Sequence, residues 1–342
     1  MEFDVAHRIF DDASADYNTG LYEQAFEKFM KLSQTREFAH IGWYWLAKTA
    51  NALGDAVLAN ELFYKALTIR PDLCKSIFPE NHPNVDYVWS GALPDEPVSG
   101  CGICGKPGKP HWTYFVMELV SAHVKSYNPV RTWMYCADCH HLYADFFPKQ
   151  SKIPISSEAG KAMFATNPEF AQYSKIINGL GKYTQGNEML EVGIGGLACA
   201  LVAQELGYTV FGLDIVEGNV LAAHKHGIDA QWMDVSLFES DKQWDIIMMG
   251  DVIEHVEDPV AVMKKMHSLL APNGVIWLST PNFDGAFTRY AGHGDPMRLE
   301  SVHKNYFSKQ SLFLLFDKAG LVPVEYTLSP TYNGSIEVIV TK

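Results

Sequence analysis

The stretch that decides the fold lies in the second half of the chain, where residues 188–197 are EMLEVGIGGL. The largely apolar segment 189–192 predicts a buried strand, and the three glycines that follow predict a turn into a helix through residue 204. Glycine lets the backbone pass close beneath a ligand, and the start of the helix presents free amides. This strand–turn–helix unit predicts a nucleotide-type binding site.

Short apolar strands alternate with helical patterns from about residue 187 onward. This alternation predicts an α/β fold of the Rossmann type, in which helices cover both faces of a largely parallel sheet. The loop between the last two strands contains Pro330 and Asn333-Gly334, which favour an antiparallel pair at the sheet edge. The strands expected are 189–192, 209–213, 244–249, 275–280, 322–327 and 336–341, and the later helices are 260–270 and 309–318.

An acidic residue, Asp214, ends the second expected strand. At that position a carboxylate can accept hydrogen bonds from two ribose hydroxyls. The glycine turn and this acid suit a dinucleotide or a nucleoside cofactor equally.

Five further sequence patterns, which occur in a fixed order, narrow the choice of cofactor and family. They are Glu191-Val-Gly193-Ile-Gly195, Gly212-Leu-Asp214, Asp234-Val235, Asp251-Val-Ile-Glu254-His255-Val-Glu-Asp258-Pro259 and Leu270-Ala-Pro272-Asn-Gly274. Together they resemble the class I S-adenosylmethionine-dependent methyltransferases, in the branch that includes the ubiquinone-biosynthesis O-methyltransferases. The resemblance covers roughly residues 185–342 and implies a seven-stranded sheet with S-adenosylmethionine as cofactor. One departure is Leu197, which stands where the family often has a third glycine.

The resemblance implies which residues hold the methionine end of the cofactor. Gly193 and Gly195 would pass under the methionine, and Glu191 would hold its ammonium through water or backbone. Gly250 and Asp251 would line the sulfonium end, where carbonyl oxygens complement its positive charge.

The nucleoside end is implied in the same way. Asp214 would bind the ribose with Ile215 beside it, Asp234 would bind the adenine amino group, and Val235 would donate a backbone amide. A simpler interpretation of Asp234 is a turn residue or the N-cap of a helix.

Asp251, Glu254 and His255 are spaced i, i+3 and i+4, which would place them on one face of a helix start. The ubiquinone enzymes have a comparable acid–acid–His set, so a divalent cation is one interpretation. The other is that the acids favour the helix N-terminus and His255 packs over the cofactor pocket.

A long insertion, residues 281–307, follows the fourth predicted strand and predicts a substrate lid. Its end, Val302-His303-Lys-Asn-Tyr306-Phe307-Ser308, resembles a His-x-x-Tyr-Phe-Ser run of sugar C-methyltransferases, where the His and Tyr serve the acid/base step. The resemblance implies His303 as general base with Tyr306 assisting. In the alternative, Tyr306 anchors the next helix, Ser308 caps it and His303 is a hydrogen-bonding lid residue. His293, between two glycines, is the second candidate base.

Two Cys-x-x-Cys pairs precede this region, Cys101 with Cys104 and Cys136 with Cys139. Four thiolates satisfy a closed tetrahedral Zn²⁺ site, which is structural because no coordination position stays open. Segments 112–120 and 131–135 predict the strands of a zinc ribbon, and the pairs resemble the zinc-binding module that precedes sugar C-methyltransferases. His140 and His141 are expected at the surface beside the site, although a histidine could replace one ligand.

The first seventy residues contain a repeat of 34 residues. Gly20, Ala25 and Phe29 recur as Gly54, Ala59 and Phe63, and this spacing resembles the tetratricopeptide repeat over residues 1–71. Two repeats are fewer than the three usually needed, so we expect the exposed end to pack on the rest of the chain or on a second copy. The repeat is either a partner-binding or dimerisation surface or a helical buttress.

These patterns divide the chain into a helical repeat (1–71), a linker (72–100), a zinc-ribbon module (101–148) and a methyltransferase domain (160–342). The 342 residues carry 27 Lys+Arg against 40 Asp+Glu, a net charge of −13, which argues against general nucleic-acid or anionic-membrane binding. The start predicts no secretory signal, no apolar run approaches a membrane span, and the cysteine pattern favours a cytoplasmic location.

The function expected from the sequence is transfer of a methyl group from S-adenosylmethionine to oxygen or carbon of a small polar acceptor, with a sugar or nucleotide-sugar as the leading example. The rival is a protein or peptide methyltransferase, or a binding adaptor, that docks its partner on the helical repeat.

Overall fold

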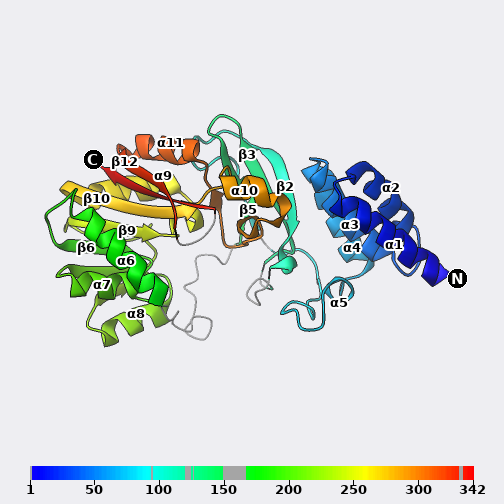
Figure 1. The fold of residues 1–342 in the computed structure, drawn as a ribbon, viewed down its shortest axis with the longest axis horizontal. Coiled ribbons are helices and arrows are strands. Elements are labelled where there is room, and N and C mark those ends of the chain that lie inside the picture. The colour runs from blue at the N-terminus through cyan, green and yellow to red at the C-terminus, as the bar shows by residue number, and fades with distance from the viewer. Residues whose placement is uncertain (1, 94, 120–124, 126, 149–166, 331–333) are drawn as a thin grey trace.

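The computed structural model describes residues 2–93, 95–119, 125, 127–148, 167–330 and 334–342. Four N-terminal helices form one end of the molecule, a large α/β sheet forms the other, and a small antiparallel sheet lies between them (Figure 1). Residues 160–166 of the expected methyltransferase domain lie outside the described residues.

The N-terminal helices form two hairpins. Gly20 and Gly54 join the two helices of each hairpin, with φ of 81° and 86°, a conformation that favours glycine. Ala25 and Phe29 in one hairpin, like Ala59 and Phe63 in the other, are buried between helices. The helices are α1 (Glu2–Asn18), α2 (Tyr22–Ser33), α3 (Ala39–Ala52) and α4 (Ala56–Ile69). The 34-residue spacing thus corresponds to two successive hairpins.

The last hairpin packs on the small sheet. The side-chain amide of Asn51 donates to the backbone carbonyl of Thr113. Its Oδ1 accepts a hydrogen bond from the backbone amide of Thr113 at 3.0 Å. The Tyr44 hydroxyl donates to Glu118 at 2.7 Å. The exposed end of the repeat is therefore covered by the rest of the chain.

The segment expected as a linker has structure of its own. It contains the short helix α5 (Cys74–Ile77) and strand β1 (Asp95–Pro97). Strand β1 pairs antiparallel with β5 (Phe146–Pro148), which follows the second cysteine pair. Residues 72–100 thereby contribute a strand to a separate two-stranded sheet with β5 instead of only connecting two modules.

The small sheet has the order β11-β4-β3-β2. Strands β2 (Lys109–Phe115), β3 (Val130–Cys136) and β4 (His141–Ala144) come from the cysteine-containing module, and the turn η1 (Val116–Glu118) follows β2. The fourth strand, β11 (Asn305–Tyr306), comes from the 281–307 insertion. The end of the expected lid, Asn305 and Tyr306, is therefore a strand of the small sheet and cannot open without breaking that pairing.

The large sheet has seven strands in the order β12-β13-β10-β9-β6-β7-β8, which confirms the predicted α/β class. Strand β13 runs antiparallel to both neighbours, and the others are parallel to one another. Strand β8 was not predicted, because its four residues are partly exposed and carry no apolar run. The strands are β6 (Glu188–Val192), β7 (Thr209–Asp214), β8 (Asp229–Trp232), β9 (Trp244–Gly250), β10 (Leu270–Pro281), β12 (Val322–Leu328) and β13 (Ser335–Thr341).

Helices cover both faces of this sheet, as Figure 1 shows. Helices α6 (Asn167–Leu180), α7 (Ala198–Glu205) and α8 (Glu217–Lys225) pack on one face. Helices α9 (Pro259–Leu269) and α11 (Lys309–Ala319) pack on the other. Among the described residues, none of the helices is long and apolar enough to cross a membrane.

Candidate functional site

The turn between β6 and α7 brings the backbone close to a neighbouring loop at the C-terminal edge of the sheet. Gly193 has a φ of 79°, and a Cβ there would lie 2.8 Å from Cγ2 of Val252. Leu197 takes the left-handed conformation, with a φ of 68°, at the residue before α7. The missing third glycine is therefore replaced by a leucine that keeps the conformation glycine favours, while its side chain is buried in the core.

The carboxylate of Asp214 holds this turn to the end of β7. Oδ2 accepts hydrogen bonds from the Gly195 amide at 3.0 Å and from Nδ2 of Asn219 at 3.1 Å. Oδ1 accepts from the Val216 amide at 2.7 Å. The two loops that would flank a ribose are thus tied together by the acid predicted to bind it.

Glu191 lies behind the glycine turn and has an unsatisfied oxygen. Its carboxyl is buried, and Oε2 has no hydrogen-bond partner within the described ranges. Burial raises the pKa of Glu191 to about 8, although a hydrogen bond from Cys199 opposes the shift. A cationic ammonium beside this carboxyl would supply the missing donor and favour its ionised form, so the residues present fit the methionine end of S-adenosylmethionine.

The part of the site expected to bind adenine is bordered by two exposed apolar side chains and by a turn. Ile215 and Trp232 are 47% and 41% exposed, and the Trp232 indole donates to the Ile215 carbonyl at 2.9 Å. The Asp234 carboxylate accepts from the Ser236 amide at 2.7 Å, the turn contact of the simpler interpretation, while Val235 is buried. Trp232 was missed in the sequence because a lone tryptophan in a short, partly exposed strand carries no pattern.

Gly250 and Asp251 lie where β9 ends, next to aromatic side chains. A Cβ on Gly250 would lie 3.4 Å from Cζ3 of Trp277 and 3.5 Å from the Tyr173 hydroxyl. Asp251 has a φ of 53°, and its Oδ1 accepts from the Ser279 hydroxyl at 3.1 Å. Tyr173 and Trp277, which the sequence did not single out, therefore bound the predicted sulfonium end.

Glu254, His255 and His303 form a buried cluster whose candidate ligand atoms lie within 4.8 Å of one another. Glu254 and His255 belong to the single turn η3 (Ile253–His255), and His303 reaches them from the insertion. Asp251 is not among these atoms, and its Oδ1 accepts a hydrogen bond from the Ser279 hydroxyl. The structure therefore groups Glu254 and His255 with His303 and not with Asp251.

Burial sets the protonation of this cluster. It lowers the pKa of His303 to about 3, with His255 adding to the shift, and it raises the pKa of Glu254 well above its usual range. The Thr280 hydroxyl donates to Oε2 of Glu254 at 3.0 Å, whereas Oε1 and the His303 Nδ1 lack partners in the described part of the chain. The His303 imidazole is thus neutral, and its Nδ1 is left without a hydrogen-bond partner among the described residues.

The other two acid/base candidates lie in different surroundings. Tyr306 is 1% exposed, and its hydroxyl donates to Oδ2 of Asp295 at 2.6 Å, not to His303. Burial and then the Asp295 charge raise its pKa. Ser308 caps α11 in a capping box with Ser311, as the alternative interpretation expected. The backbone at His293 forms a short turn, and its side chain lies outside the described part of the structure.

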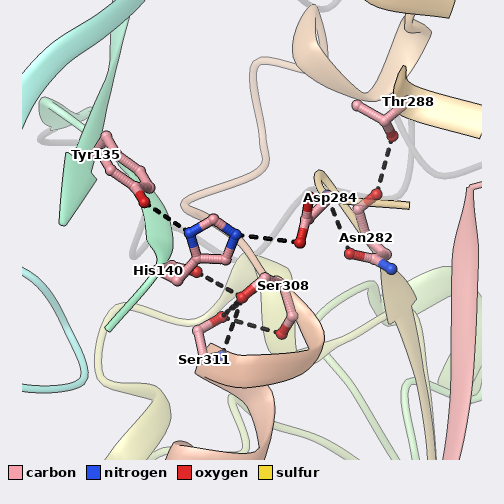
Figure 2. A network of polar contacts seen from close by, with 7 residues as sticks. All are labelled: Tyr135, His140, Asn282, Asp284, Thr288, Ser308 and Ser311. Carbon is pink, nitrogen blue, oxygen red and sulfur yellow. Dashed lines mark hydrogen bonds and ion pairs between the residues drawn. The ribbon is translucent and has the colours of Figure 1, made fainter. Parts of the chain in front are cut away.

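A polar junction connects the cysteine module to the loop after β10 (Figure 2). The Tyr135 hydroxyl lies 2.6 Å from Nδ1 of His140, whose Nε2 lies 3.1 Å from Oδ2 of Asp284. The Ser308 hydroxyl donates to the His140 carbonyl at 2.6 Å. His140 is thereby a link between three segments.

His141, expected at the surface, is fully buried instead. It packs on Phe307, and its Nε2 lies 3.2 Å from Oδ1 of Asn305 on the neighbouring strand. That strand belongs to the insertion, a partner more than 160 residues away that local sequence could not reveal.

The four module cysteines converge on one point. Their Sγ atoms lie within 4.8 Å of one another, and those of Cys104 and Cys136 are 3.6 Å apart. A tetrahedral ion with Zn–S bonds of about 2.3 Å would hold its sulfurs roughly 3.8 Å apart. The Ile103 amide points at the Cys101 sulfur at 3.4 Å. The donor set therefore fits one structural Zn²⁺.

Buried neutral histidines predict how stability depends on pH. Burial lowers the pKa of His141 to about 4, against about 6.5 in the unfolded chain. Between these values the unfolded chain binds a proton that the folded chain does not, so the free energy of unfolding falls as the pH decreases. We expect urea titrations at pH 7 and pH 5 to show a smaller difference for His141→Gln than for the wild type.

The matched control is His226→Gln, at an exposed position at the end of α8. It should keep the wild-type difference between the two pH values. An unchanged difference in His141→Gln would contradict the assignment of the effect to His141.

Comparison with known proteins identifies the large α/β part. Residues 165–326 match the family described as "Methyltransferase domain". A ubiquinone biosynthesis O-methyltransferase of Dinoroseobacter shibae is 29% identical over 175 residues, 47% of this chain and 70% of that protein. The enzyme of the same name from Ruegeria pomeroyi is 29% identical over 153 residues, 41% of this chain and 62% of that protein.

Among solved structures, this chain is similar to Burkholderia thailandensis 1,6-didemethyltoxoflavin-N1-methyltransferase, with 20% sequence identity and a TM-score of 0.40. The match covers 50% of this chain and 77% of that one. Seven strands in the expected arrangement, the glycine turn tied to Asp214 and the family match agree. Residues 165–326 are a class I S-adenosylmethionine-dependent methyltransferase domain, related to the ubiquinone biosynthesis O-methyltransferases.

Proposed function

We propose that the protein transfers a methyl group from S-adenosylmethionine to oxygen or carbon of a small polar acceptor, with a sugar or nucleotide-sugar as the leading example. The observation that carries the cofactor part is the Asp214 carboxylate, held between the Gly195 and Val216 amides beside the glycine turn. The acceptor part rests on the resemblance of residues 302–308 to sugar C-methyltransferases.

The chain would hold the cofactor along the C-terminal edge of the large sheet. Asp214 would accept hydrogen bonds from the ribose, and the unsatisfied Glu191 oxygen would accept one from the ammonium. Gly250 leaves room beside Trp277 for the reacting end. When bound there, S-adenosylmethionine supplies an electrophilic methyl group on a positively charged sulfur. The protein's task is then alignment and removal of the acceptor's proton.

His303 is the proposed general base. Its neutral ring and its unsatisfied Nδ1 support this role. A pKa of about 3 makes it a weak base while Glu254 stays protonated; loss of the Glu254 proton, which burial disfavours, would raise that pKa. Tyr306 would assist indirectly, because its hydroxyl holds Asp295 and so fixes the insertion. His293 stays the second candidate.

His303→Ala is expected to bind S-adenosylmethionine with unchanged affinity and to lose turnover by about 10²–10⁴-fold, the usual contribution of a general base. Calorimetry measures the binding, and transfer of a labelled methyl group to a panel of sugars and nucleotide-sugars measures turnover. The exposed His226→Ala serves as the control and should keep both properties. Wild-type turnover in His303→Ala would remove His303 from the mechanism.

We also propose a structural Zn²⁺ on Cys101, Cys104, Cys136 and Cys139. The convergence of the four sulfurs supports it, as does the ion pair of Lys106 with Asp138, 2.7 Å, which joins the two cysteine turns. With its ion, the cysteine cluster would fix β3 and β4, and the insertion's strand β11 pairs with β4.

The helical hairpins act as a buttress in this proposal, since α3 and α4 pack on β2. The rival, docking of a protein partner on these helices, predicts methyl transfer to protein in an extract of the source cells. The cytoplasmic location stays a prediction from the cysteine pattern.

A further inference from the structure

A groove of about 450 Å³ runs between α6 and the large sheet. Its walls are mostly apolar, with Ile176 and Leu180 from α6 and Trp277 and Ile339 from the sheet. Glu337 on β13 also lines it. The proposed chemistry assigns no task to this groove or to Glu337.

Strand register places one end of the groove beside the expected sulfonium end. Ser279 on β10 pairs with Gly250 on β9 and with Glu337 on β13. Residues directly opposite one another on paired strands point to the same face of a sheet, so Ser279 and Glu337 share a face. The same face carries Trp277 and Ile339, which pack with α6 and α7. The carboxyl of Glu337 therefore lies on the cofactor side of the sheet edge.

Glu337 is 8% exposed, and its carboxyl is incompletely satisfied. Burial raises its pKa, and hydrogen bonds from the side chains of Ser329 and Trp277 oppose this shift. Its Oε1 is buried and finds no hydrogen-bond partner in the described part of the chain. Leaving a buried acceptor unpaired is costly, and in the walls of a groove a ligand can provide the donor.

The groove is separate from the His303 cluster. Thr280, the residue after Ser279, points to the opposite face of β10, where it donates to Glu254. At the groove's other end, Glu325 is paired with Lys182 at 2.7 Å. Glu337 is thus a buried carboxyl at the cofactor end, whereas Glu325 is a rim carboxylate already neutralised by a lysine.

We propose that this groove binds a small organic molecule with an apolar body and a protic group, a hydroxyl or an ammonium, and that the Glu337 carboxylate accepts a hydrogen bond from that group. This binding site goes beyond the proposed methyl transfer, because His303 lies with Glu254 on the opposite face of β10 and cannot reach a molecule held in the groove. Glu337 is the residue that determines the specificity of the groove.

Three probes of the same shape test the chemistry: benzyl alcohol, benzylamine and toluene, each titrated into the full chain by calorimetry with ligand-observed NMR for weak binding. We expect benzyl alcohol or benzylamine to bind at least about tenfold more tightly than toluene, because a hydrogen bond to a charged group is worth that much or more. Glu337→Leu should abolish the preference. Glu337→Gln should reduce binding of benzylamine alone if the recognised group is an ammonium, and should spare benzyl alcohol.

Two further variants guard against misfolding as an explanation. Glu325→Gln, the rim control, should keep the preference of the wild type. Gly179→Phe should weaken all three probes, because a Cβ at Gly179 meets nothing within 4 Å and a larger side chain would occupy the groove without touching Glu337.

Equal binding of the three probes by the wild type, a preference that survives Glu337→Leu, or full binding by Gly179→Phe would each overturn the inference. S-adenosylmethionine binding is measured on the same proteins. Its absence from the wild type would defeat the proposed function, whereas intact cofactor binding without probe preference would defeat only the groove.

Discussion

Asp214→Ala is expected to abolish measurable binding of S-adenosylmethionine. The carboxylate would lose its hydrogen bonds to the ribose, and hydrogen bonds to a charged group contribute about 1.5–3 kcal/mol each. Losing two of them corresponds to an affinity decrease of about 10²–10⁴-fold. The Gly195 and Val216 amides would also lose their acceptor, so the loops that flank the site would no longer be tied together. Isothermal calorimetry with purified protein measures the effect.

Two companion variants separate the loss of contacts from the loss of folding. Asp229→Ala changes an exposed aspartate at the start of the neighbouring β8 and should bind the cofactor normally. Asp214→Asn retains one acceptor oxygen and should fall between wild type and alanine. Thermal unfolding shows whether each variant is folded. Wild-type affinity in a folded Asp214→Ala protein would exclude the proposed cofactor site.

Cys136→Ser is expected to remove the metal and destabilise the middle of the molecule. Cys136 is fully buried at the end of β3, the strand that also carries Trp133 and Arg131. The Trp133 indole donates to the Arg298 carbonyl at 2.9 Å, and Arg131 donates to the Ser301 carbonyl, so β3 holds the insertion. Apparent binding free energies of structural zinc are about 10–16 kcal/mol in small peptides, and this free energy contributes to folding.

Metal analysis should find about one zinc ion per wild-type chain and close to none in Cys136→Ser, with a large decrease in the unfolding temperature. The control is Cys74→Ser, which changes a buried cysteine outside the cluster and should keep the metal. A chelator should lower the unfolding temperature of the wild type and of this control, but not that of Cys136→Ser. Metal-free wild-type protein would refute the zinc assignment.

Much of the large sheet could be predicted because its signals are local. Strands β6, β7 and β9 are buried apolar segments, and each was expected within one residue of its observed bounds. Strand β8 was not predicted because its side chains are half exposed. Helix α9 ended one residue early because Leu270 already begins β10. The buried strands therefore had clearer sequence patterns than the half-exposed strand β8.

The insertion has a feature that local sequence patterns could not predict. Its sequence predicted a lid, and the structure uses Asn305 and Tyr306 as a strand of the small sheet. Hydrogen bonding between strands more than 160 residues apart depends on how the two modules pack, which no local spacing encodes. The same packing buries His141 and brings His303 to Glu254.

The sequence by itself determined the class of the domain, the glycine turn with its acid at Asp214, and the two cysteine pairs, because each depends on residue types at short, fixed spacings. Only the tertiary structure decided which buried polar groups meet and which are left without a partner. His303 beside Glu254, and Glu337 opposite Ser279 in the groove under α6, were set by strand order and register. Burial then shifted their pKa values, since the cost of a buried charge depends on neighbours that only the folded chain supplies.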